Sequence, residues 1–115
     1  MKNLFVPDEL SLLAQKKGFD EKCFAIFDNE GFRLTTEPLR NSQIEGNHWR
    51  FAYPLYQQLI DWFDQKEIHI YAFKYNGNWH WKIDVNNSVD SYSEINGDRY
   101  EALNQAFKRA FNLIS

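Results

Sequence analysis

Apolar residues recur at helical spacing in three segments of the chain, which we expect to form α-helices. Residues 7–17 begin at a proline, carry two acidic residues in the first turn and end before a glycine, as helices often do. Residues 53–66 also have a proline near their start and carry a broad apolar stripe. Residues 98–114 open with Asp98 and Glu101 in the spacing of a capping box and have one apolar face.

Shorter stretches with strand-like composition predict two β-hairpins. In the first hairpin, residues 23–27 and 32–35 flank the sequence DNEG, which is typical of a tight turn. The second hairpin, residues 68–85, has Asn76-Gly77 at its centre. This dipeptide is a strong hairpin signal because both central residues of a type I′ turn need a positive φ.

A two-residue turn fixes which residues of the second hairpin lie opposite each other. Counting outward from the turn pairs Tyr75 with Asn78, and the following pairs alternate between two faces. One face is apolar and consists of Ile68, Ile70, Ala72, Trp81, Ile83 and Val85. The other face consists of the pairs Phe73 with His80, Tyr71 with Lys82 and His69 with Asp84. Both faces therefore carry large rings, although a hairpin usually turns one face to the core and one to water.

The first half of the chain repeats the plan of the second, so we expect the same division into faces. The residues expected to face the core together with the Trp81 set are Ala25, Phe27, Phe32 and Leu34. Phe24 and Ile26 would then lie on the opposite face, beside Tyr71 and Phe73.

The predicted fold is a single α+β domain spanning residues 1–115, a length typical of one domain. A mainly antiparallel sheet of two β-hairpins packs with three helices, in the order α-β-β-α-β-β-α. Residues 36–52 show no clear periodicity and are expected to form a long loop, with a short extra strand at residues 48–52 as an alternative. Residues 86–97 are expected to form a polar loop.

Composition and charge indicate where such a protein works. The 13 basic and 16 acidic residues give a net charge of −3, which opposes non-specific attraction to nucleic acid phosphates. Cys23 is the single cysteine, so an internal disulfide is excluded. No signal-peptide pattern and no apolar run of about 20 residues is present, so we expect a protein of the bacterial cytoplasm without a membrane segment.

Sequence motifs for catalysis or metal binding are absent, including HExxH, paired CxxC, an EF-hand loop, GxSxG, Walker A and GxGxxG. In the predicted register His69 and His80 pair with different residues, and a contact between His69 and Asp84 is the expected role of the former. Cys23 begins an apolar strand, where a buried inert thiol is commoner than a nucleophile. We therefore expect no enzyme, metal or cofactor; the alternative is an enzyme with an unrecognised carboxylate or histidine site that includes His48.

The candidate functional residues are those of the second aromatic face: Phe24, Ile26, Tyr71, Phe73, Tyr75, His80 and Lys82. A helix or the long loop could cover this face, it could form a homodimer, or it could bind another macromolecule. Exposed rings on a sheet also stack on single-stranded RNA or DNA. Only Arg33, Lys74 and Lys82 would accompany the rings, and the RNP-like pattern is absent, which ranks nucleic acid below protein as the partner.

The segments VPDELSLLAQKKGFDEKCFAIFDNEG, PLYQQLIDWFDQK, IHIYAFKYNGNWHWKI and YEALNQAFKRAFNLI resemble, in this order, a group of small proteins of phages and mobile elements of Bacteroidetes. The group shares a GFDE-x-CF segment and a YQQ-x-IDW helix. The resemblance implies a phage protein that binds and inhibits a host factor rather than an enzyme. Anti-CRISPR proteins, which inhibit Cas nucleases, are one class of this kind, so the expected partner is a host protein, with a CRISPR effector nuclease as one candidate.

Overall fold

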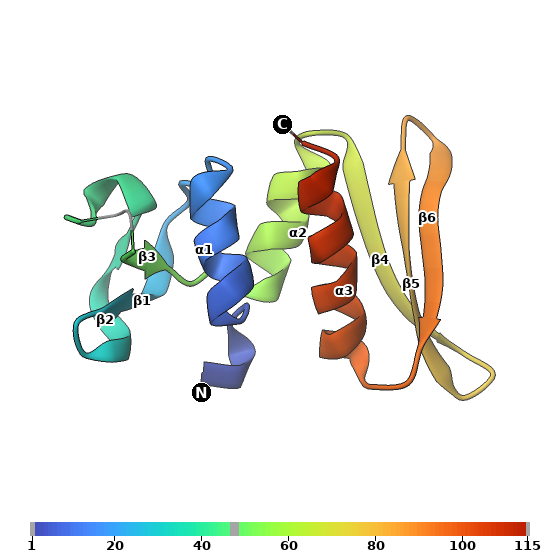
Figure 1. Ribbon diagram of the computed structural model, residues 1–115, viewed down its shortest axis with the longest axis horizontal. Helices are drawn as coiled ribbons and strands as arrows, with labels where there is room; N and C mark the ends of the chain where they lie inside the picture. Colours follow the sequence, from blue (N-terminus) through green and yellow to red (C-terminus); the bar gives the residue numbers. More distant parts are fainter. Residues whose placement is uncertain (1, 47–48, 115) are drawn as a thin grey trace. The chain divides into compact units, whose positions relative to one another are not determined.

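The computed structural model describes residues 2–46 and 49–114, and it divides into two compact units, residues 1–59 and 60–115. The described residues form three α-helices and two three-stranded antiparallel sheets in the order α-β-β-β-α-β-β-β-α (Figure 1). The α+β class and the three helices are confirmed. The strands differ from the prediction, because each hairpin gains a third strand and the two hairpins belong to separate sheets. The expected single domain stays a prediction.

The first unit contains a helix, a three-stranded sheet and two short 3₁₀ turns. Helix α1 (Asp8–Lys16) follows Pro7, and its first turn carries Asp8 and Glu9, which favour the positive end of the helix dipole. The strands are β1 (Cys23–Asp28), β2 (Gly31–Leu39) and β3 (Phe51–Ala52), in the spatial order β2-β1-β3. The 3₁₀ turns are η1 (Lys2–Leu4) and η2 (Asn41–Gln43).

The core of the first unit is aromatic. One cluster of buried residues consists of Phe5, Ala25, Phe51 and Tyr53, with Leu12, Phe27, Phe32 and Leu55 packed against it. The prediction that Ala25, Phe27 and Phe32 face a core is therefore confirmed, whereas Leu34 is exposed. These residues do not share a core sheet with Trp81 as predicted, because Trp81 belongs to the other sheet.

Only part of segment 36–52 is a loop, because strands occupy both of its ends. Strand β2 extends to Leu39, and the chain then returns to add β3 to the other edge of β1. Buried Asn41 holds this return: its side-chain amide donates to the Phe19 carbonyl at 2.8 Å and its Oδ1 accepts from the Ala52 amide at 2.8 Å. The alternative strand at residues 48–52 is confirmed only for Phe51–Ala52, and His48 lies outside the described residues.

Helix α2 (Tyr56–Asp64) contains the boundary between the two units. It begins two residues after Pro54 rather than at the proline, because Leu55 still forms a β-bridge with Phe5. At the other end Glu67 has a φ of 61°, a left-handed conformation that terminates helices and that glycine usually occupies.

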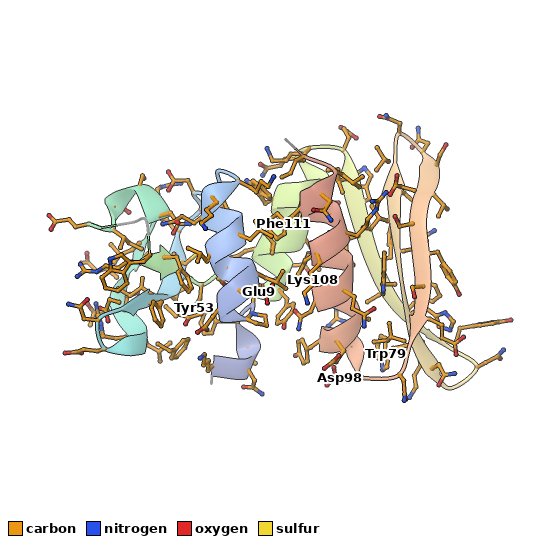
Figure 2. The ribbon with its side chains drawn as sticks, in the orientation of Figure 1. Glu9, Tyr53, Trp79, Asp98, Lys108 and Phe111 are labelled. Atoms are coloured by element: carbon orange, nitrogen blue, oxygen red, sulfur yellow. The ribbon has the colours of Figure 1, made fainter. Side chains whose placement is uncertain are left out.

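The second unit contains strands β4 (Ile68–Tyr75), β5 (Asn78–Val85) and β6 (Ser88–Ile95) in this order, followed by α3 (Arg99–Asn112). The predicted register of the β4–β5 hairpin is confirmed at every pair from Tyr75–Asn78 to Ile68–Val85. Asn76 and Gly77 both have a positive φ, as a type I′ turn requires. The Asp98 side chain caps α3 by accepting from the Glu101 amide at 2.9 Å (Asp98 is labelled in Figure 2).

The predicted polar loop 86–97 is wrong, because residues 88–95 form strand β6. Asn86 and Asn87 both adopt a positive φ and turn the chain between β5 and β6 just as Asn76-Gly77 does between β4 and β5. Asparagine tolerates this left-handed conformation better than most residues. Strand β6 contains few apolar residues, so the sequence shows no clear alternation of apolar and polar positions there.

Helix α3 covers one face of the sheet, which we call the inner face (Figure 1). The buried inner-face residues include Ile68, Ile70, Trp81 and Ile83, and the buried stripe of α3 is Ala102, Leu103, Ala106, Phe107, Ala110 and Phe111. Phe63 of α2 packs against Phe107 and Phe111 with ring centroids 6.1 and 5.0 Å apart. This burial leaves the opposite face of the sheet without a covering helix in the second unit.

Candidate binding surface

The opposite face, which we call the outer face, is built from alternate residues of the three strands. Its members are His69, Tyr71, Phe73, Tyr75, Asn78, His80, Lys82, Asp84, Val89, Tyr92 and Glu94. Trp79, next to His80 in the chain, lies on the side of α3 (Figure 2). Central strand β5 contributes polar side chains, and edge strands β4 and β6 contribute most of the rings.

His80 lies at the centre of an aromatic cluster on the outer face. Its ring stacks on Phe73 with centroids 5.4 Å apart and an interplanar angle of 9°. Tyr75 meets it edge-on at 6.0 Å, and Tyr92 leans over it at 5.5 Å. These rings leave His80 only 5% exposed, so a residue of the outer face is shielded by its neighbours rather than by a helix.

Both ring nitrogens of His80 are hydrogen-bonded. Nε2 lies 3.3 Å from the Tyr75 carbonyl oxygen, which can only accept, so Nε2 carries the proton and donates. In the neutral imidazole Nδ1 is then an acceptor, to which the Tyr92 hydroxyl, 2.6 Å away, donates. The hydroxyl of an exposed tyrosine and the imidazole therefore link β5 to β6 in a defined geometry.

Lys82 is the cation of the outer face. Its Nζ lies 5.0 Å from the centroid of the Tyr71 ring and 3.5 Å from Oδ2 of Asp84. Oδ1 of the same carboxylate is buried and accepts no hydrogen bond within the described part of the chain. The charge of Lys82 is thus already shared between an aromatic ring and a carboxylate of the same surface.

Three tyrosines make the outer face accessible to a partner. Tyr71, Tyr75 and Tyr92 are 45%, 61% and 54% exposed, and Val89 beside them is also exposed. Phe73 and Lys82 are half-buried between them. The surface is therefore a band of large rings around a buried imidazole, open to solvent.

The structure separates the seven predicted site residues into two groups. Tyr71, Phe73, Tyr75, His80 and Lys82 share the outer face, as the register predicted. Phe24 and Ile26 lie on β1 of the other sheet and do not extend this surface. Phe24 is 49% exposed, whereas Ile26, which pairs with Ala52 of β3 and with Arg33 of β2, is only 4% exposed.

Sequence reasoning missed the contribution of β6, which is Val89, Tyr92 and Glu94. The signal that could have revealed it was Asn86-Asn87, directly after a strand and eight residues before the next turn. The predicted contact of His69 with Asp84 is also replaced. His69 instead bonds to Asp64 at 2.8 Å and lies 3.4 Å from Glu67, since β4 begins just after α2 ends. The hydrogen bond to Asp64 is the main cause of a raised pKa of His69.

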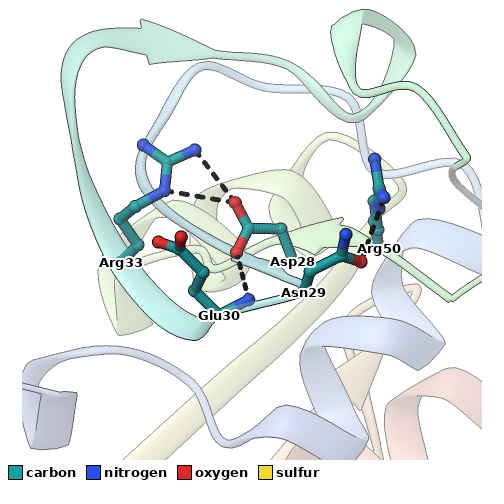
Figure 3. A pocket seen from close by; sticks show the side chains of 5 residues that line it. All are labelled: Asp28, Asn29, Glu30, Arg33 and Arg50. Atoms are coloured by element: carbon teal, nitrogen blue, oxygen red, sulfur yellow. Dashed lines mark hydrogen bonds and ion pairs between the residues drawn. The ribbon is translucent and has the colours of Figure 1, made fainter.

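Apart from the outer face, the first unit has a polar hollow at the β1–β2 turn. It is lined by Asp28, Asn29, Glu30, Arg33 and Arg50 (Figure 3). The Glu30 amide, followed by the Arg33 guanidinium, lowers the pKa of the Asp28 carboxyl. Arg50 donates to Oδ1 of Asn29 at 3.0 Å and stacks 4.7 Å from the Trp49 ring centroid. The polar groups of the hollow therefore bond to one another and stabilise the β1–β2 turn.

The remaining candidates for chemistry have ordinary surroundings. Cys23 is fully buried, and burial raises the pKa of its thiol to about 12, so the thiolate is scarce at neutral pH. Burial and a hydrogen bond to Asp8 also raise the pKa of Tyr53. Residues 2–46 and 49–114 contain no cluster of three or more side chains able to hold a metal ion. Nor is any helix among these residues long and apolar enough to cross a bilayer.

Comparison with protein-family models finds no matching family, and comparisons with curated proteins and with solved structures find no significant match. The resemblance to phage and mobile-element proteins therefore stays a prediction. The outer face has to be interpreted from its own chemistry.

Proposed function

We propose that this protein is a non-enzymatic binding protein that uses the outer face of the β4-β5-β6 sheet to contact and block another protein. The observation that carries the proposal is the open band formed by Tyr71, Tyr75 and Tyr92. Large exposed apolar patches usually mark interaction sites, and tyrosine is enriched at protein interfaces because it joins an apolar ring to a polar tip.

The charges around the rings favour a protein partner over single-stranded nucleic acid. Two carboxylates, Asp84 and Glu94, accompany one ammonium group, that of Lys82, and this lysine is paired with Asp84. Of the other predicted cations, Arg33 lies on the other sheet, where it pairs with Asp28. Lys74 alternates with Phe73 and so belongs to the inner face. A surface without free cations attracts phosphate groups poorly.

The expected partner is a host protein of a bacterium, and a CRISPR effector nuclease is the particular candidate. This part of the proposal rests on the resemblance to phage and mobile-element proteins, and it places the protein in the bacterial cytoplasm. An inhibitor needs no catalytic residues of its own, because occupying a functional surface of the target is sufficient.

A site-specific photocrosslinking experiment tests the use of the outer face. A photoreactive phenylalanine analogue replaces Tyr75 in one sample and Phe24 in a matched control, since Phe24 is similarly exposed but lies on the other sheet. We expect one host protein to crosslink from position 75 and not from position 24. Purified target should then lose activity with wild-type protein but much less with Tyr75→Ala.

Three results would contradict the proposal. Crosslinking of the same protein from both positions would show that the outer face is not the specific contact. A mobility shift with single-stranded RNA or DNA that weakens steeply with salt and is lost in Tyr75→Ala would favour the nucleic acid alternative instead. A homodimer formed through the face would appear as doubled mass in light scattering of the protein alone.

A further inference from the structure

We propose that the protein segment bound by the outer face presents an arginine, whose guanidinium pairs with Glu94 and stacks on Tyr92. The inference rests on the proposed function and adds the chemistry of the partner. Tyr92 and Glu94 stand two residues apart on β6, so their side chains point to the same face about 7 Å apart. A carboxylate beside an exposed ring is a suitable receptor for a planar cation.

Glu94 is the carboxylate of the outer face that is available to a partner. It lies opposite His80 in the register and lines a hollow with Asn78, Ile95 and Asn96. Oε1 accepts a hydrogen bond from the Asn78 amide, which fixes the carboxylate while leaving Oε2 free to accept another. No cation within the described residues forms an ion pair with Glu94, in contrast to Asp84, which Lys82 neutralises.

One ring of the outer face already makes a cation–π contact within the protein. The ammonium group of Lys82 lies 5.0 Å from the Tyr71 centroid. Tyr75 and Tyr92 have no such cation within the described part of the chain, although both are more exposed than Tyr71. The Tyr92 ring is in addition held in place by its hydroxyl bond to His80, so less side-chain freedom is lost when a ligand stacks on it.

Arginine fits this arrangement better than lysine. Its guanidinium is planar, so it can lie flat on a ring and direct its N–H groups sideways to a carboxylate at the same time. A lysine ammonium is a compact, strongly hydrated charge that gains less from stacking. An acidic segment would face the exposed carboxylate of Glu94, which has no ion pair within the described residues, and like-charge repulsion disfavours it.

The test uses the full chain and three capped peptides, Gly-Arg-Gly-Arg-Gly, Gly-Lys-Gly-Lys-Gly and Gly-Glu-Gly-Glu-Gly, titrated into isotope-labelled protein and followed by NMR. We expect the arginine peptide to shift the signals of Asn78, Tyr92 and Glu94 saturably and to bind about three- to tenfold more tightly than the lysine peptide. The glutamate peptide should shift none of them. Glu94→Gln should weaken arginine-peptide binding by about three- to tenfold. The matched control Glu101→Gln removes an exposed carboxylate of α3 and should leave binding unchanged.

The outcomes separate this inference from the proposed function. Equal binding of arginine and glutamate peptides, no binding of either, or an unchanged affinity in Glu94→Gln would overturn the inference. If the crosslinked host protein is nevertheless captured from position 75 and retained by Glu94→Gln, the outer face is the binding surface and only its arginine preference is wrong. If arginine peptides bind as expected while no host protein crosslinks from position 75, the local chemistry stands and the proposed function fails.

Discussion

The two sheets of this protein start from similar hairpins and differ in what the chain does next. In the first unit it leaves β2, passes through a 3₁₀ turn anchored by Asn41 and returns to place two-residue β3 beside β1. In the second unit it leaves β5 through Asn86-Asn87 and adds eight-residue β6 at once. Ile26 on β1 is buried, whereas the tyrosine rings around His80 in the β4-β5-β6 sheet reach solvent.

This difference shows that a strand pattern with rings on both faces has two outcomes. In the first sheet, one of the two residues expected outside the core, Ile26, is buried and the other, Phe24, is exposed. In the second sheet, three tyrosines stay exposed and a histidine is buried among them. Eight-residue strand β6, with its own Tyr92, widens the face instead of covering it.

The core between the helices and the inner face of the β4-β5-β6 sheet should carry most of the stability of the second unit. Phe107 is fully buried and stacks on Phe63. Phe107→Ala should lower the free energy of unfolding by about 3–5 kcal/mol, because it removes a large ring and leaves a cavity. Tyr75→Ala on the outer face of the same sheet should cost less than about 1 kcal/mol. Urea denaturation of both variants measures this, and equal losses would mean that the outer face is part of the core.

The return segment of the first unit should depend on a single side chain. Asn41→Ala removes both the donor to the Phe19 carbonyl and the acceptor for the Ala52 amide, leaving two backbone groups without partners. We expect a loss of about 2–3 kcal/mol in the free energy of unfolding. Ser42→Ala, a neighbouring exposed change, should stay within about 0.5 kcal/mol of wild type. Faster hydrogen exchange of the Ala52 amide in Asn41→Ala alone would locate the effect, and unchanged exchange would contradict it.

The bond between Tyr92 and His80 should stabilise the outer face modestly. Tyr92→Phe keeps the ring but removes the hydroxyl that donates to Nδ1, so it should cost about 0.5–1.5 kcal/mol. Tyr75→Phe is the matched control, since the Tyr75 hydroxyl makes no hydrogen bond within residues 2–46 and 49–114. Thermal unfolding of the two variants compares them, and an equal effect would mean that the hydroxyl bond contributes nothing.

Two surface groups, His69 in the second unit and Asp28 in the first, should each make stability depend on pH, in opposite directions. The hydrogen bond to Asp64 raises the pKa of His69, so its stabilisation is complete below the unfolded pKa of 6.5 and is lost as pH rises through the folded pKa. The Glu30 amide and Arg33 lower the pKa of Asp28, so its stabilisation is present above 3.8 and is lost as pH falls through the folded pKa.

Difference measurements isolate these two groups. The stability difference between wild type and His69→Gln should be larger at about pH 5.5 than at about pH 8.5. The difference between wild type and Asp28→Asn should shrink as the pH falls from about 5 to about 3. Differences that stay constant over these intervals would exclude the two hydrogen bonds as sources of stability.

Local pattern determined much of this protein by itself. The three helices, the two predicted hairpins β1–β2 and β4–β5 and the full β4–β5 register follow from residue periodicity and from turn residues. Both signals are properties of a few neighbouring residues. Five of the seven predicted surface residues share one face for the same reason, since side chains alternate along a strand regardless of what surrounds it.

Tertiary structure alone decided the rest. Whether two hairpins join one sheet and whether Ile26 is buried depend on contacts between residues distant in the chain, such as the hydrogen bonds of Asn41. Polar residues 88–95 become a strand by pairing with β5, which their own few apolar residues do not indicate although Asn86-Asn87 offers a turn. The energies of such pairings depend on the partner strand more than on the residue itself. It is the pairing of β6 with β5 that places Tyr92 and Glu94 on the outer face.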